Sequence, residues 1–189
     1  MGVAPILKLS AEQYLDIDRK AELKSEFHDG ILFPIVAVSL RHGMIAVNAA
    51  KILAMRLENS SCAAATSPVR VRVRADKFVY PDILVFCGKP ALTDESQDTI
   101  TNPKVIVEVL SPSTADYDYG AKFAYYRELA SFEEYLLVSQ TEPKAEVFQK
   151  SPDGYWILRT IAGPGARVQM QSLKIEFPLE DLYRGVTFD

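Results

Sequence analysis

Two short apolar runs most constrain what this chain can fold into. Residues 80–87 and 105–110 are almost continuously hydrophobic, and each ends at a glycine or a serine–proline break. Such runs are typical of strands buried on both faces, as in a parallel or mixed sheet covered by helices. Residues 116–130 have a helical pattern and precede a third apolar run at 134–139, which favours a right-handed parallel crossover. We therefore predict a mixed α/β fold.

Local signals predict the remaining elements. Ser10 followed by Gln13 has the spacing of a capping box, and Ser39 can cap a longer helix. The dipeptide Asp29-Gly30 favours a hairpin turn. The segments expected from these signals are helices at 10–19 and 39–58, a hairpin at 26–36, a strand at 69–74, a loop at 88–102, short strands near Glu146 and Trp156, and a C-terminal tail of loops and short elements.

Length and composition limit the class of protein. With 189 residues, 48% of them hydrophobic and 24% charged, we expect one soluble domain spanning residues 1–189. No stretch approaches the roughly 18 apolar residues of a membrane span. Cys62 and Cys87 match no zinc spacing, so we expect two free thiols, no disulfide framework and a reduced, cytoplasmic setting. The presence of only two histidines excludes a histidine-rich metal site.

The formal net charge is −4. Proteins that bind nucleic acid through many phosphate contacts usually carry a basic surface, so this charge counts against a strong, non-specific DNA binder. It does not exclude a nuclease, because a carboxylate-rich active site is acidic until a cation binds.

Two carboxylates near the apolar runs indicate metal-assisted hydrolysis of a phosphodiester. Asp82 opens the apolar stretch 83–86, and Glu108 closes the stretch 105–107, shortly before the break at 111–113. Adjacent strands would bring them together, and Mg²⁺ is commonly held by one or two carboxylates and several waters. A bound dication lowers the pKa of its water and neutralises charge that develops on the phosphate. Lys122, on the following helix, would orient the attacking water or stabilise the transition state.

Each of these residues also has a structural interpretation. An aspartate after proline commonly ends a strand, Glu108 could form a buried salt bridge, and Lys122 could be a solvated helix lysine. Tyr126 follows Lys122 by four residues and shares its helix face, so it could hold the lysine or a ligand phosphate, or pack at the edge of the core. The combination favours the catalytic interpretation.

Five further residues are candidates for the site. Glu26 could add an acidic group or face water on its hairpin, and His42 could contact a phosphate, assist proton transfer or cap its helix. Arg70, Arg72 and Arg74 alternate along one strand, so they could follow a nucleic-acid backbone or form an ordinary solvated face.

Several motifs together resemble one known family. They are Tyr-Pro-Asp-Ile-Leu-Val at 80–85, Ile-Val-Glu-Val-Leu-Ser-Pro-Ser-Thr at 106–114, then Asp118, Lys122 and Tyr126, with further likeness at 25–30, Arg41-His42 and 135–138. This set is similar to the Uma-type family of restriction endonucleases, which belongs to the PD-(D/E)XK nuclease superfamily. The likeness covers nearly the whole chain.

The resemblance implies a restriction-endonuclease-like fold, with a mixed central sheet flanked by helices and an N-terminal hairpin and helices. It implies that Asp82 and Glu108 are ligands of Mg²⁺ or Mn²⁺, with the Val109 carbonyl as a third. The superfamily's usual lysine, two residues after the glutamate, is replaced here by Leu110. Lys122 is therefore the candidate for that lysine.

These observations predict a metal-dependent endonuclease that hydrolyses DNA through a metal-activated water. A homodimer is expected, because a cut through both strands needs two sites. Two alternatives remain: a catalytically silent module that binds DNA or a protein on the same fold, and a metal-dependent hydrolase that acts on another substrate.

Overall fold

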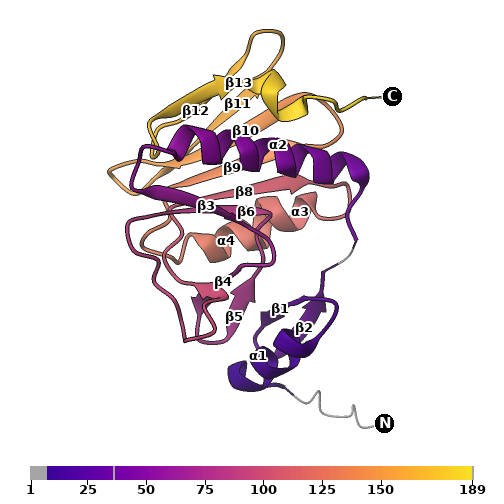
Figure 1. Ribbon diagram of the computed structural model, residues 1–189, viewed down its shortest axis with the longest axis vertical. Coiled ribbons are helices and arrows are strands. Elements are labelled where there is room, and N and C mark those ends of the chain that lie inside the picture. The colour runs from indigo at the N-terminus through magenta and orange to yellow at the C-terminus, as the bar shows by residue number, and fades with distance from the viewer. Residues whose placement is uncertain (1–7, 36, 189) are drawn as a thin grey trace.

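The predicted apolar strands lie side by side in a six-stranded mixed sheet (Figure 1), in the computed structural model that describes residues 8–35 and 37–188. Strand β8 (Val105–Leu110) pairs antiparallel with β6 (Ile83–Cys87) and parallel with β9 (Glu134–Ser139). The predicted mixed α/β sheet is therefore confirmed. The remaining strands of this sheet are β3 (Cys62–Thr66), β10 (Lys144–Lys150) and β11 (Trp156–Ala162), in the order β11-β10-β9-β8-β6-β3.

Both faces of β8 are covered, which explains its unbroken apolar sequence. Val105, Val107 and Val109 pack in the cluster that contains the buried face of α2 (Leu40–Leu57). Ile106 and Leu110 point to the opposite face, toward the helical segment that follows β8. Because side chains alternate along a strand, Glu108 shares the face of Ile106 and Leu110. Its carboxylate is thereby directed at that segment.

The segment after β8 is helical but interrupted. It consists of α3 (Ala115–Tyr117), a π-helical turn η1 (Asp118–Lys122) and α4 (Phe123–Tyr126). The helix predicted at 116–130 therefore exists but ends earlier, because tighter three-residue turns after Tyr126 redirect the chain toward β9. Such π-turns frequently occur at functional sites, and this one carries Lys122.

A second sheet joins the N-terminal hairpin to the middle of the chain. Its order is β2 (Ile31–Pro34), β1 (Ser25–His28), β5 (Lys77–Val79), β4 (Arg70–Arg74) and β7 (Thr99–Ile100). The predicted turn is confirmed, since Asp29 and Gly30 both have positive φ, as a two-residue hairpin turn requires. The hairpin was predicted to end at Val36, which lies outside the described residues. The predicted capping box is also present at Ser10, where it begins α1 (Ala11–Lys20).

Several short strands were not predicted. Strands β3, β5 and β7 have weak sequence signals and depend on pairing with neighbours that are distant in the chain. Strand β7 lies inside the predicted loop at 88–102. In the tail, β12 (Arg167–Met170) and β13 (Ile175–Pro178) form a two-stranded sheet, followed by a 3₁₀ helix, η2 (Leu179–Tyr183).

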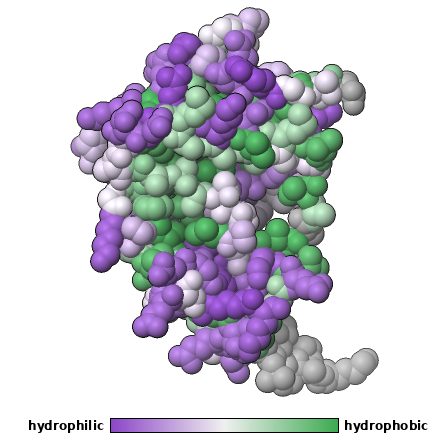
Figure 2. All heavy atoms as spheres, in the orientation of Figure 1, coloured by the Kyte–Doolittle hydropathy of each residue, from purple (hydrophilic) through white to green (hydrophobic). Residues whose placement is uncertain are grey.

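The viewed face combines apolar and polar regions. Hydrophobic residues gather across its middle, over α2 and β3, while hydrophilic residues dominate the two ends (Figure 2). No helix among the described residues has the length and apolar character needed to cross a bilayer.

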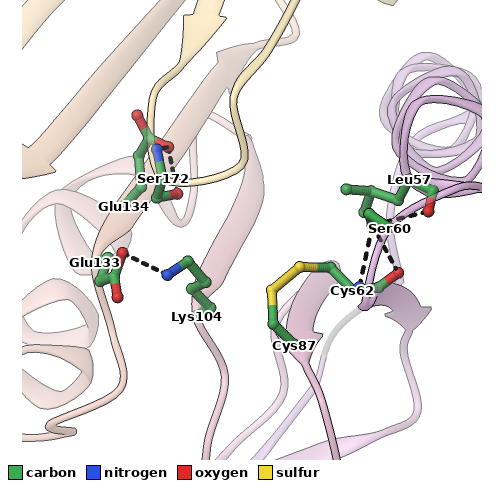
Figure 3. Close-up of a disulfide and its surroundings, with 8 residues drawn as sticks. All are labelled: Leu57, Ser60, Cys62, Cys87, Lys104, Glu133, Glu134 and Ser172. Atoms are coloured by element: carbon green, nitrogen blue, oxygen red, sulfur yellow. Dashed lines mark hydrogen bonds and ion pairs between the residues drawn. A yellow bond between two sulfur atoms is a disulfide. The ribbon is translucent and has the colours of Figure 1, made fainter.

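The prediction of two free thiols is wrong. Cys62 and Cys87 are directly opposite each other in the antiparallel pair β3–β6 and are joined by a disulfide (Figure 3). The Ser60 hydroxyl accepts the Cys62 amide and donates to the Leu57 carbonyl, which ties this edge of the sheet to the end of α2. Sequence spacing alone could not reveal the pairing, because strand register creates it. The inference of a reduced setting, which rested on free thiols, loses its support.

The disulfide should contribute to stability by restricting the unfolded chain. It links residues 25 positions apart, a separation for which a contribution of about 2–4 kcal/mol is expected. Reductant should lower the denaturant midpoint of the wild-type protein accordingly and leave that of the Cys62→Ala, Cys87→Ala double variant unchanged. Equal midpoints for the wild type with and without reductant would contradict this expectation.

Candidate active site

Asp82 and Glu108 meet at the junction of β6 and β8. Ile83 is paired with Val107, so Asp82, just before β6, lies next to Glu108. The Asp82 amide donates to Glu108 Oε2 at 3.1 Å, and the Val109 amide donates to Asp82 Oδ2 at 2.8 Å. Backbone groups thus hold both carboxylates beside each other.

Lys122 projects from the π-helical turn into a group of carboxylates. Its Nζ lies 2.9 Å from Glu108 Oε1, 3.6 Å from Asp118 Oδ1 and 3.7 Å from Glu26 Oε1. It also donates to the Tyr80 carbonyl at 3.1 Å. Lys122 is 6% exposed, so the alternative of a solvated helix lysine is wrong. The ammonium depends on these acceptors in place of water.

Glu26 reaches the same group from β1, so the alternative of a glutamate facing water is wrong. It accepts hydrogen bonds from the Tyr80 amide at 3.0 Å and the Tyr117 hydroxyl at 2.6 Å, and His28 Nε2 lies 3.2 Å from it. Burial alone would raise the pKa of Glu26, but the charge of Lys122 and these hydrogen bonds lower it to about 2. Glu26 is therefore ionised at neutral pH.

The pKa values of the other two carboxylates near Lys122, those of Glu108 and Asp118, are shifted in the opposite direction. Burial raises the pKa of Glu108 well above its ordinary value, and the charges of Asp82 and Asp118 add to this, while Lys122 opposes it. Burial also raises the pKa of Asp118, again against the effect of Lys122. A positive charge placed near Glu108 would favour its ionised form.

For Lys122 itself, burial lowers the pKa, but the charges of Glu108, Glu26 and Asp118 more than offset this and raise it well above the ordinary value. Lys122 therefore remains protonated at neutral pH. In this state it can orient a water or stabilise negative charge, and it cannot accept a proton.

These residues line a cavity of about 930 Å³. Glu26, Asp82, Glu108, Asp118 and Lys122 contribute one polar wall. The volume lies within the range of roughly 300–1,000 Å³ that is usual for small-molecule sites. Among the described residues, no three histidine, cysteine or carboxylate side chains converge as a complete metal site. A cation here would need further oxygens from water or a ligand, as Mg²⁺ commonly does.

Comparison with known proteins assigns the chain to a family. Residues 11–180 match the Uma2 family, which is described as "Putative restriction endonuclease". The chain belongs to the Uma2 family. Two relatives from Synechocystis sp., both called uncharacterized proteins, support this: sll1609 is 34% identical over 93% of this chain and 99% of its own length. The second, slr1290, is 32% identical over 98% of this chain and 96% of its own length.

A solved structure shares this Uma2-type fold. It is described as a "putative nuclease belonging to DUF820" from Anabaena variabilis and has a TM-score of 0.78. The alignment covers 97% of this chain and 100% of the other, at 17% sequence identity. The predicted family resemblance is confirmed, and the fold is nuclease-like.

Two residues predicted to bind substrate contact the acids, and one of them, His42, also lines the cavity. The hydroxyl of Tyr126, which is fully buried, donates to Glu108 Oε1 at 2.9 Å, so it is placed to orient that carboxylate rather than to reach a substrate. His42, in the first turn of α2, has Nε2 at 3.1 Å from Asp82 Oδ1. Nε2 is thus the donor in this hydrogen bond, because a carboxylate only accepts.

The predicted row of exposed arginines is wrong in part. Arg70 is 2% exposed and is paired with Asp18 and Asp98, inside the protein. Arg72 is half-buried, and Arg74 is exposed and paired with Asp29 and other acids. None of the three lines the cavity. The alternating pattern identified the strand but not which face the second sheet would bury.

Three residues near the site had no predicted role. They are His28, Tyr117 and Asp118. Two weak signals existed: Asp118 precedes Lys122 by four residues, and His28 follows Glu26 by two on the same strand, so each pair shares a face. Tyr117 had no such signal, because its contact with Glu26 spans 91 positions.

The lowered pKa of Glu26 predicts a specific acid sensitivity. Its value is 4.5 ordinarily and about 2 in the folded protein, so its contribution is present above pH 4.5 and is lost as the pH falls toward 2. The shift corresponds to a contribution on the order of 3 kcal/mol. Urea unfolding should show Glu26→Gln less stable than wild type at pH 6, with the difference shrinking toward pH 3.

Tyr117→Phe provides a matched control, because it removes one hydrogen bond from the same carboxylate. It should show a smaller difference with the same pH trend. Parallel stability profiles of wild type and Glu26→Gln across this range would contradict the assignment.

Proposed function

We propose that this protein is a metal-dependent endodeoxyribonuclease that hydrolyses DNA phosphodiester bonds with Mg²⁺ or Mn²⁺. The observation that carries the proposal is the meeting of Asp82, Glu108 and Lys122, from three separate elements, at one wall of a large cavity. Two acids and a lysine beside a space of this size are a suitable set for phosphoryl chemistry. The nuclease-like fold of the family supports the same activity.

The donor set fits a hard cation. Asp82 and Glu108 supply carboxylate oxygens. Both oxygens of Asp82 and Oε2 of Glu108 each accept one hydrogen bond and keep a second lone pair. Glu108 Oε1 is already shared by Lys122 and Tyr126. The Val109 carbonyl is proposed as a third donor. A cation held by these groups would supply a water of lowered pKa and would neutralise charge on the phosphate. Water and substrate oxygens would complete the coordination, as is usual for Mg²⁺.

The chain's own residues would orient the attacking water and hold the two acids in place. Lys122, kept protonated by its carboxylate neighbours, would direct a water or stabilise negative charge on the phosphate in the transition state. Tyr126 and His42 hold Glu108 and Asp82 in place. Glu26 offsets the charge of Lys122 from the side of the second sheet. Such supporting contacts typically matter 10- to 100-fold for metal affinity or activity.

A cut through both strands would need two such sites, so we propose that the active form is a symmetric homodimer.

The second candidate function is a catalytically silent binding module on the same fold. The close Lys122–Glu108 pair is the observation in favour of this module, because a purely structural ion cluster would give the same contact. Binding of DNA without cleavage under all metal conditions would select this candidate.

Metal binding should raise thermal stability through Asp82. A ligand at about 100 times its Kd stabilises the folded state by about 2.7 kcal/mol, or roughly 5–10 °C in Tm for a chain of this length. We expect this shift for Mn²⁺ in the wild type, its loss in Asp82→Asn, and its retention in Asp153→Asn, which changes an exposed aspartate. An equal shift in wild type and Asp82→Asn would place the metal elsewhere.

Cleavage of supercoiled and single-stranded DNA tests the catalytic role. Asp82→Asn or a chelator should abolish cleavage, and Tyr126→Phe should slow it roughly tenfold, because the hydroxyl that orients Glu108 is removed. Tyr119→Phe is the matched control, since its hydroxyl also contacts a glutamate, Glu146, outside the carboxylate group. Equal losses in the two tyrosine variants, or cleavage that survives Asp82→Asn, would remove the proposed mechanism.

A further inference from the structure

The cavity has a second wall that the proposed chemistry does not use. Ile31 and Phe33 of β2, with Ile35 just beyond it, occupy alternate positions and therefore share one face. They remain 38%, 47% and 37% exposed, and all three line the cavity. Val38, 57% exposed, continues this apolar wall. Four apolar side chains thus face the same space as the carboxylates.

The ring of Phe33 packs against a neighbouring ring of the same hairpin. The His28 ring packs against it with centroids 5.0 Å apart, and the Tyr125 ring packs against His28 at 5.2 Å. His28 is in turn held by Glu26 through Nε2. Phe33 is therefore an exposed aromatic ring whose position is restricted by its contact with His28. This restriction lowers the entropy cost of stacking a ligand on the ring.

The charges of the cavity argue against binding mainly through phosphates. Among the described residues that line it, Lys122 is the one lysine or arginine, and its ammonium is already shared by three carboxylates. A bare phosphodiester would meet a negative wall here. Where no cation neutralises this wall, affinity must come largely from a contact that is independent of charge, and the apolar wall supplies one.

We propose that the apolar wall of Ile31, Phe33, Ile35 and Val38 stacks an unpaired nucleobase, so that the preferred substrate is DNA with a single-stranded segment. This inference rests on the proposed nuclease function for the identity of the ligand. A base in a duplex is already stacked and must be extruded before it can occupy such a cavity, whereas an unpaired base is available at once. Stacking on an aromatic ring is tolerant of sequence, because every base has a π-face.

Binding can be measured independently of cleavage. The full-length protein in chelator is titrated into a fluorescently labelled single-stranded oligonucleotide and into the same sequence as a blunt duplex. We expect tighter binding of the single strand. Phe33→Ser should weaken this binding roughly 5- to 50-fold, in the range expected for one base–aromatic stack. Its salt dependence should stay unchanged, because no phosphate contact is lost.

Two control variants test whether a loss of DNA binding is specific to the aromatic ring at position 33. Phe33→Trp retains an aromatic surface and should bind as well as the wild type or better. Leu158→Ser changes a strand residue that is 48% exposed, nearly the same as Phe33, but lies outside the cavity, and it should bind like the wild type. Thermal unfolding of each variant establishes that it is folded.

The outcomes separate this inference from the nuclease function. Preferred cleavage of intact duplex, unaffected by Phe33→Ser, would overturn the inference and leave the nuclease function standing. Single-strand binding that depends on Phe33, without any cleavage, would support the inference and overturn the catalytic proposal. If Phe33→Ser instead converts a dimer to a monomer in sedimentation while DNA binding is unchanged, the wall is a self-association surface and the inference fails.

Discussion

The buried ammonium of Lys122 is the interaction on which the site depends. It stands among Glu108 from β8, Glu26 from β1 and Asp118 from its own π-helical turn. Each of these charges, taken alone, would cost several kcal/mol to bury. Together they compensate one another, and in doing so they link the six-stranded sheet, the second sheet and the intervening helix. A chain that failed to bring all of them together would carry unpaired charges in its interior.

The same hairpin contributes to two unlike walls of the cavity. The hairpin that supplies Glu26 from β1 also supplies β2, whose apolar side chains face the same space. The hairpin and the chain just after it therefore supply the apolar wall and Glu26, and the β6–β8 junction and the π-helical turn supply the rest of the polar wall. In the proposed function the polar wall serves the phosphate and the apolar wall serves the base.

Much of the central sheet was predictable because its signals are local. The apolar runs at β6, β8 and β9 reflect burial on both faces, and the crossover between β8 and β9 follows from the helical stretch between them. The adjacency of Asp82 and Glu108 followed from the same reasoning. Short strands such as β3 and β7 were missed, because β3 is mostly alanine, β7 has two residues, and a partner strand stabilises each. The disulfide between Cys62 and Cys87 was missed for the same reason.

By itself, the sequence determined which segments form buried strands, which residue types could hold a cation, and which family the motifs resemble. Only the tertiary structure decided the environment of each charge. It buried Arg70 between two aspartates, paired Lys122 with three acids, and turned Tyr126 toward Glu108. The physical reason is that strand and helix periodicity is encoded by neighbouring residues, whereas desolvation and ion pairing depend on groups that are tens of positions apart and meet only when the sheets pack.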